Sequence, residues 1–172
     1  MIEMSPHVRL AVATIDAYVR HGEIIDIPEY VSRDMLETSA GAFVCLKMDG
    51  QLRGCIGTIE PAMDNLALEI RENAISAAMR DPRFMPVEVR ELEHIICQVD
   101  VLCPPEPVYD IKDLDAKRYG VIVESGLRRG LLLPDLDGVD SPEQQIDIAR
   151  RKAFIKQDDM IKLYRFEIAR FD

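Results

Sequence analysis

The stretch "LRGCIG", Leu52–Gly57, poses the first problem of the fold. It follows an Asp-Gly turn signal at residues 49 and 50, so it is expected to be the return strand of a β-hairpin. Alternate side chains of a strand share a face, so Arg53 and Cys55 are expected side by side, with Gly54 on the opposite face. The segment therefore predicts a strand that sets a guanidinium beside a thiol.

The register of this hairpin depends on the length of its loop. A two-residue loop pairs Lys47 with Leu52 and places the lysine on the face that also carries Ile56. A three-residue loop, residues 48–50, pairs residue 46 with 52 and residue 44 with 54. We prefer the three-residue loop because it gathers the apolar side chains, and a one-residue shift would exchange the two faces. One face then carries Ala42, Val44, Leu46, Leu52, Gly54 and Ile56, and the other carries Cys45, Lys47, Arg53 and Cys55.

The two faces of the expected hairpin predict different roles. On the packed face, the missing side chain of Gly54 lets another element approach closely, and Gly57 permits a bend or bulge. On the other face, the cations Lys47 and Arg53 favour the thiolate form of Cys55, which makes this cysteine a candidate nucleophile. The alternative is that Cys55 is a small buried hydrophobe and Arg53 a structural ion-pair donor.

Composition bounds the class of protein. The 172 residues lie in the range of one domain, expected to span residues 1–172, and an apolar content of 48% suffices for a core. The net charge of −10 disfavours binding to nucleic acid or to an anionic membrane surface. No apolar run reaches the ~20 residues of a membrane span, and the N-terminal segment lacks the pattern of a secretory signal. A cytoplasmic protein with four free thiols is therefore expected.

Hydrophobic periodicity predicts an α+β fold, with a mainly antiparallel sheet flanked by helices. Helices are expected over residues 6–21, 62–80 and 142–153, and the first and last have N-terminal capping signals at Ser5 and Ser141. Strands are expected over residues 42–48, 51–59, 94–103, 119–124, 130–133 and 160–171. The segment "CPPEPVYD", residues 103–110, is a candidate separator of two lobes.

A second polar segment, "RDPRF", closes the helix expected over residues 62–80. Arg83 has two interpretations: it pairs with Asp81 and fixes the loop, or it faces a cleft as an anion-binding group. The three histidines are scattered, and the chain has neither an HExxH motif nor a phosphate-binding glycine loop. No metal or cofactor is therefore expected.

The motif "LRGCIGTIEP" resembles the signature of the AMMECR family, named for a chromosomal region of Alport syndrome, midface hypoplasia and elliptocytosis. The resemblance continues through "NAISAAMRDPRFMPV", "ELEHIICQVDVLCPPEPV", "RYGVIVESGLRRGLLLPDL" and, more weakly, "IARRKAFI". Prokaryotic members are called AmmeMemoRadiSam system protein A. This chain departs from the pattern at Cys45, where threonine is expected, and at Phe154, where glycine is expected. It also lacks the tryptophan that the family carries before the last helix.

The resemblance implies two unequal lobes with a cleft between them, and association with a Memo-type protein and a radical-SAM protein. It implies no established reaction. Two hypotheses follow: an accessory or adaptor protein that docks one of these partners, or an enzyme with Cys55 as thiolate nucleophile and Arg53 binding a small anionic substrate. The residues expected at the cleft are Lys47, Gly54, Gly57, Asp81 and Arg83.

Overall fold

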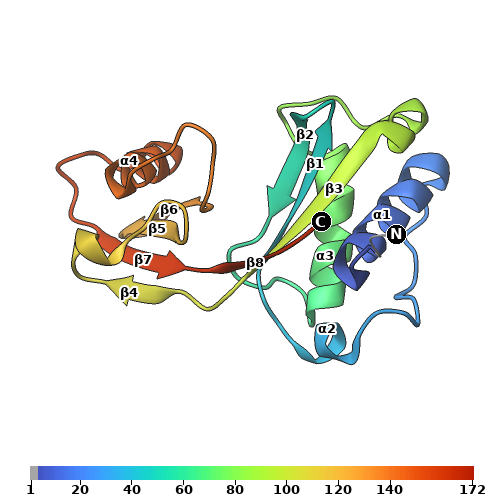
Figure 1. Cartoon of the computed structure of the whole chain (residues 1–172), viewed down its shortest axis with the longest axis horizontal. Coiled ribbons are helices and arrows are strands. Elements are labelled where there is room, and N and C mark those ends of the chain that lie inside the picture. The colour runs from blue at the N-terminus through green and yellow to red at the C-terminus, as the bar shows by residue number, and fades with distance from the viewer. Residues whose placement is uncertain (1–3) are drawn as a thin grey trace. The chain divides into compact units, whose positions relative to one another are not determined.

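The computed structural model describes residues 4–172 and contains two four-stranded sheets (Figure 1). The chain divides into two compact units. Unit 1 takes the residues up to Val101 together with Ala169–Asp172, and unit 2 takes Leu102–Ile168. The first boundary falls just before the predicted separator, residues 103–110. The α+β class is confirmed, whereas the single two-lobed domain over residues 1–172, with its cleft, stays a prediction.

Unit 1 is a sheet of order β2-β1-β3-β8 with helices packed on it. Its strands are β1 (Ala42–Met48), β2 (Gln51–Gly57), β3 (Ile95–Leu102) and β8 (Ile168–Phe171). Its helices are α1 (Pro6–His21), α2 (Arg33–Glu37), α3 (Leu66–Met79) and the 3-10 turn η1 (Val89–His94). The core lies between the sheet and helices α1 and α3, where Leu10, Val44, Leu46 and Ile70 are fully buried.

The β1–β2 hairpin corrects the predicted register. Asp49 and Gly50 both have positive φ, 52° and 76°, and form a two-residue turn that pairs Lys47 with Leu52. Beyond Arg53 the register shifts, so that Leu46 faces Gly54 and Cys45 faces Cys55. The three-residue loop was wrong because it ignored a bulge, which moves one residue out of the ladder and restores the apolar face further along.

Unit 2 is a sheet of order β4-β7-β5-β6 with helix α4 packed against it. Its elements are β4 (Glu106–Val108), η2 (Ile111–Asp113), β5 (Gly120–Ser125), β6 (Arg128–Leu132), α4 (Pro142–Lys152) and β7 (Lys162–Phe166). Its core includes Val121, Val123, Leu132 and Ala149. The capping box of α4 forms as predicted, with Ser141 and Gln144 each accepting a backbone N–H.

The expected terminal strand, residues 160–171, is two strands in different sheets. β7 joins the sheet of unit 2, and β8 joins the sheet of unit 1 after the single residue Glu167. The alternation of apolar and polar residues continues through β7 and β8, because every strand has the same period of two. The pattern therefore cannot show that the chain passes from one sheet to the other. Among residues 4–172, no helix combines the length and the apolar character that crossing a bilayer requires.

Close approach of helix to sheet depends on one glycine in each unit. A Cβ on Gly54 of β2 would overlap the carbonyl oxygen of Ala77 in α3, as predicted for the packed face. In unit 2, a Cβ on Gly130 of β6 would overlap the carbonyl oxygen of Ala149 in α4 in the same way. Gly54 and Gly130 each lie on an edge strand of their sheet. At each glycine the backbone of the covering helix packs directly against the backbone of the strand.

Candidate functional site

Arg53 is the unpaired residue of the β2 bulge. Its guanidinium contacts the segment that follows α3. Its Nε and Nη2 donate to the two carboxylate oxygens of Glu91 at 2.8 and 2.9 Å. Both side chains are largely buried, with 13% and 18% of their surface exposed. Arg53 is therefore a structural ion-pair donor, as the alternative reading predicts, and its bidentate partner is a residue that the sequence analysis missed.

Asp81 seals the outer edge of β2, the edge strand in the order β2-β1-β3-β8. Its buried carboxylate accepts from the backbone N–H of Cys55 at 2.9 Å. The same carboxylate accepts three bonds from Arg83, from the backbone N–H and from Nε and Nη2. Arg83 in turn donates from Nη2 to the carbonyl of Cys55 at 3.1 Å. The pair thus substitutes for a strand at this edge, and the Asp81–Arg83 ion pair is confirmed.

These contacts fix the charge states of the segment after α3. The hydrogen bond from Arg83 lowers the pKa of Asp81 well below its ordinary value, against the opposing effect of burial. The hydrogen bond from Arg53 likewise lowers the pKa of Glu91. Both carboxyl groups are therefore ionised at neutral pH, and each is matched by an arginine.

Cys45 and Cys55 face each other across β1 and β2 and are joined by a disulfide, with their Cα atoms 4.1 Å apart. The expectation that all four thiols are free is corrected for these two. The Sγ of Cys55 is bonded in this form, so the role of nucleophile stays a prediction that applies only after reduction. Neither register considered from the sequence pairs these two residues, because only the bulge places them opposite each other.

The remaining cysteines are free, Cys97 buried and Cys103 exposed. Burial raises the pKa of Cys97 to about 12, which keeps its thiol protonated. We therefore expect Cys103 to react with iodoacetamide in the folded, unreduced protein, Cys97 only after unfolding, and Cys45 and Cys55 only after reduction. Mass spectrometry of the labelled peptides checks this order. Labelling of Cys55 in the unfolded but unreduced protein would contradict the disulfide.

The other residues expected at the cleft lie apart from this cluster. Lys47 is exposed on β1 and lies between Leu52 and Ile96 of the neighbouring strands. Gly54 lies on the helix-covered face. Gly57 ends β2, where a Cβ would overlap the ring of Phe43, so its small size serves packing, and the bulge lies at Arg53 instead. Their role in binding stays a prediction.

A buried polar network that the sequence analysis missed holds the segment between β2 and α3. Glu69 of α3, 2% exposed, accepts from the hydroxyl of Thr58 at 2.5 Å and from the backbone N–H groups of Ala62 and Met63. Asn73, one turn further along, donates to Thr58 and to the carbonyl of Ala42. A buried carboxylate satisfied in this way has a structural role. Within residues 4–172 no group of three or more His, Cys, Asp or Glu side chains could hold a metal ion.

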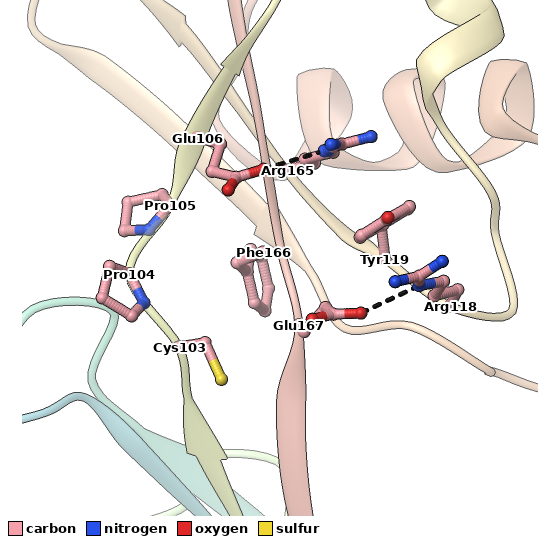
Figure 2. A pocket seen from close by; sticks show the side chains of 9 residues that line it. All are labelled: Cys103, Pro104, Pro105, Glu106, Arg118, Tyr119, Arg165, Phe166 and Glu167. Atoms are coloured by element: carbon pink, nitrogen blue, oxygen red, sulfur yellow. Dashed lines mark hydrogen bonds and ion pairs between the residues drawn. The ribbon is translucent and has the colours of Figure 1, made fainter.

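Unit 2 contains a separate pocket with a volume of about 430 Å³. Figure 2 shows Tyr119 between the side chains of Arg118 and Arg165, with Phe166 and Cys103 nearer the other wall. These residues come from β4, from β7 and from the segments just before β4 and β5, so only the tertiary fold assembles them. No local pattern in the sequence marks these residues as a site.

Fold and contacts define a class: an α+β protein of two units, each with a four-stranded antiparallel sheet covered by helices, in which an Asp–Arg pair seals the edge of the "LRGCIG" strand. The chain belongs to the AMMECR1 family, whose model matches residues 8–171.

Relatives and a solved structure agree with this assignment. A Thermotoga maritima protein is 54% identical and covers 99% of both chains. The Clostridium acetobutylicum protein CA_C1420 is 46% identical over 98% of this chain, which corresponds to 36% of that longer protein. The crystal structure of the uncharacterised protein PH0010 from Pyrococcus horikoshii superposes with a TM-score of 0.84 at 31% identity, covering 95% of this chain and 88% of that one.

Proposed function

We propose that this protein is an accessory or adaptor protein that docks a Memo-type or radical-SAM partner through an apolar patch on unit 2. The patch consists of Leu127, Phe154 and Met160, whose exposed fractions are 105%, 85% and 91%. Large exposed apolar side chains mark interaction surfaces when they gather on one face, and Phe and Met are enriched there. This patch is the observation that carries the proposal.

Arg128 ties together the segments that bear the patch. It lies in β6 beside Leu127, and its Nη1 donates to the carbonyl of Phe154 at 2.8 Å. Its Nη2 donates to the carboxylate of Asp159, next to Met160, at 2.9 Å. Arg128 thus holds the β5–β6 turn against the segment that follows α4. The patch is thus supported by a defined backbone arrangement.

Phe154 is strained in a way that favours a role in docking. Its φ of 56° lies in the left-handed region, which suits glycine and is costly for a bulky residue. The family pattern has glycine here. An exposed phenylalanine in a conformation that glycine would adopt freely adds nothing to the core, so retention for contact with a partner explains it.

The length of one relative also supports a role beside other protein modules. The Clostridium protein contains the region similar to this chain as about a third of its length. A domain found alone in one protein and as part of a longer chain in another fits a function exercised together with a second module. The identity of the partner rests on the family resemblance.

We expect replacement of Phe154 by glycine to have opposite effects on stability and on docking. Relief of the left-handed strain should raise the free energy of unfolding by about 1 kcal/mol. Loss of the aromatic contact should weaken partner binding by about tenfold or more. The first effect is measured by urea unfolding, and the second by co-purification and calorimetry with the Memo-type and radical-SAM proteins.

A matched pair of methionines controls this experiment. Met160→Ser removes part of the patch, whereas Met85→Ser removes a methionine of similar exposure, 81%, from unit 1. The first should weaken docking and the second should not. Equal binding by all three variants, or no complex with either partner at micromolar concentration, would overturn the proposal.

The second candidate function is a thiolate enzyme that uses Cys55, with Arg53 binding an anionic substrate. It requires reduction of the Cys45–Cys55 disulfide, and Arg53 is already held by Glu91. Its support is the guanidinium of Arg83 at the backbone of Cys55, which would favour a thiolate in the reduced protein. Alkylation of reduced Cys55 no faster at pH 7 than that of a small-molecule thiol would exclude it.

A further inference from the structure

The pocket of unit 2 combines apolar walls with two pairs of opposite charges (Figure 2). Pro104, Pro105 and Phe166 supply apolar surface. Its volume of about 430 Å³ lies at the small end of the range of ~300–1,000 Å³ for ligand pockets. The space therefore suits a small molecule rather than a large cofactor.

The charged side chains are arranged around Tyr119. Arg118 pairs with Glu167 at 2.8 Å, and Arg165 pairs with Glu106 at 3.2 Å. The two guanidinium carbons lie 4.9 and 4.4 Å from the centre of the Tyr119 ring. The ring restrains both arginines without consuming their N–H groups, so their positions are set while donors stay available.

Several of these donors and acceptors have no protein partner within the part of the chain that the structure describes. Arg118 uses only Nε, so both of its terminal nitrogens are open, and Arg165 uses Nε and Nη1. The carboxylates of Glu106 and Glu167 are 65% and 49% exposed and each accepts from one arginine. The pocket therefore offers both cationic donors and anionic acceptors.

We propose that this pocket binds a small zwitterion of the amino-acid type with an apolar or aromatic side chain. The terminal nitrogens of Arg118 hold its carboxylate, since a guanidinium matches that group with two parallel hydrogen bonds. The carboxylates of Glu106 and Glu167 receive its ammonium group. Pro104 and Pro105, which are exposed, contact its side chain.

The charge balance of the pocket selects this ligand class. A dianionic phosphate would meet both arginines but would be repelled by the two glutamates. A hydrocarbon would leave charged groups without water or partners. A ligand with one charge of each sign satisfies both sets of groups, and this inference does not depend on the docking function proposed above.

Cys103 provides a reporter inside the pocket. It lines the cavity and is the exposed free cysteine among residues 4–172. A bound ligand should slow its reaction with iodoacetamide in the unreduced protein. Four probes separate the contributions: L-phenylalanine, 3-phenylpropionate without the ammonium, phenethylamine without the carboxylate, and inorganic phosphate. We expect saturable protection by L-phenylalanine, and binding at least about tenfold weaker for the other three, since each lacks a charged contact or meets repulsion.

Variants test whether the protection arises in this pocket. Arg118→Gln should weaken protection by L-phenylalanine by about tenfold or more, because it removes the carboxylate partner. Arg33→Gln, which removes a surface arginine of unit 1, should leave protection unchanged. Circular dichroism verifies that both variants fold. Calorimetry with the same probes provides a second measurement that does not depend on Cys103.

Three results would overturn the proposal. One is the absence of both protection and heat of binding with millimolar L-phenylalanine. Another is protection by 3-phenylpropionate or phosphate that equals protection by L-phenylalanine. The third is full retention of protection in Arg118→Gln.

Discussion

Replacement of Asp81 by alanine should destabilise unit 1 by about 2–3 kcal/mol, the usual cost of removing a charged hydrogen-bond partner, since the side chain of Arg83 is 54% exposed and stays solvated. The carboxylate is 2% exposed and accepts four hydrogen bonds, from Cys55 and Arg83. Alanine would leave the backbone N–H of Cys55 without its partner and would free the edge of β2. Urea unfolding followed by circular dichroism measures the loss.

The pH dependence of this loss identifies the carboxylate as its source. Because the folded pKa of Asp81 is lowered, its ionised form stabilises the protein above the unfolded pKa of about 4, and this contribution is lost as the pH falls through the folded value. The difference in unfolding free energy between the wild type and Asp81→Ala should therefore be constant from about pH 5 to pH 8 and should shrink below about pH 4.

Two controls accompany the Asp81 variant. Arg83→Met leaves Asp81 its two backbone donors, and the side chain of Arg83 is 54% exposed, so a smaller cost of about 1–2 kcal/mol is expected. Asp16→Ala removes a surface ion pair with Arg20 and should cost less than about 1 kcal/mol. A loss for Asp81→Ala no larger than that of Asp16→Ala would contradict the edge-sealing role.

Replacement of Gly54 by alanine should cost about 3 kcal/mol or more, at or above the upper end of the usual range for overpacking. The added methyl group would overlap the carbonyl oxygen of Ala77. A clash with backbone cannot be relieved by a change of rotamer, so α3 must move away from the sheet and open the core of unit 1. The shift in the midpoint of urea unfolding measures the cost.

Two other glycines serve as controls for the predicted effect of Gly54→Ala. Gly50→Asn keeps a residue that tolerates positive φ at a position with open space around it, so a change within about 1 kcal/mol is expected. Gly130→Ala repeats the backbone clash in unit 2, against Ala149, and should be as destabilising as Gly54→Ala. Stability of Gly54→Ala equal to that of Gly50→Asn would contradict the close packing of α3 on β2.

Elements with local signals were predicted well. Helix α1 begins after Ser5 and ends at Gly22, whose φ of 70° is the left-handed conformation expected of a glycine there. The capping box at Ser141 likewise gave the start of α4. Helix α3 begins at Leu66 rather than at residue 62, because the side chain of Asn65 accepts from the backbone N–H of Leu68 and caps the helix there. This capping signal is local and was overlooked.

The hairpin shows how a local pattern can give the right face and the wrong register. On the predicted apolar face, Val44, Leu46 and Gly54 are buried as expected, whereas Leu52 pairs with Lys47 and is 43% exposed. The bulge at Arg53 was not, because its cause lies elsewhere in the chain. The bulged segment is held by Asp81 and Glu91, which lie after the C-terminal end of α3. Nothing in the sequence of the hairpin predicts these contacts.

Alternation, capping residues and turn signals act over a few residues, and for that reason the chain itself specified the α+β class, the major helices and strands, and the packed side of Gly54. Contacts between distant segments decided the rest: the pairing of Arg53 with Glu91, the division of the last strands between two sheets, and the pocket around Tyr119. The Cys45–Cys55 disulfide depends on the bulge in the hairpin. These depend on three-dimensional proximity, which hydrophobic periodicity does not encode.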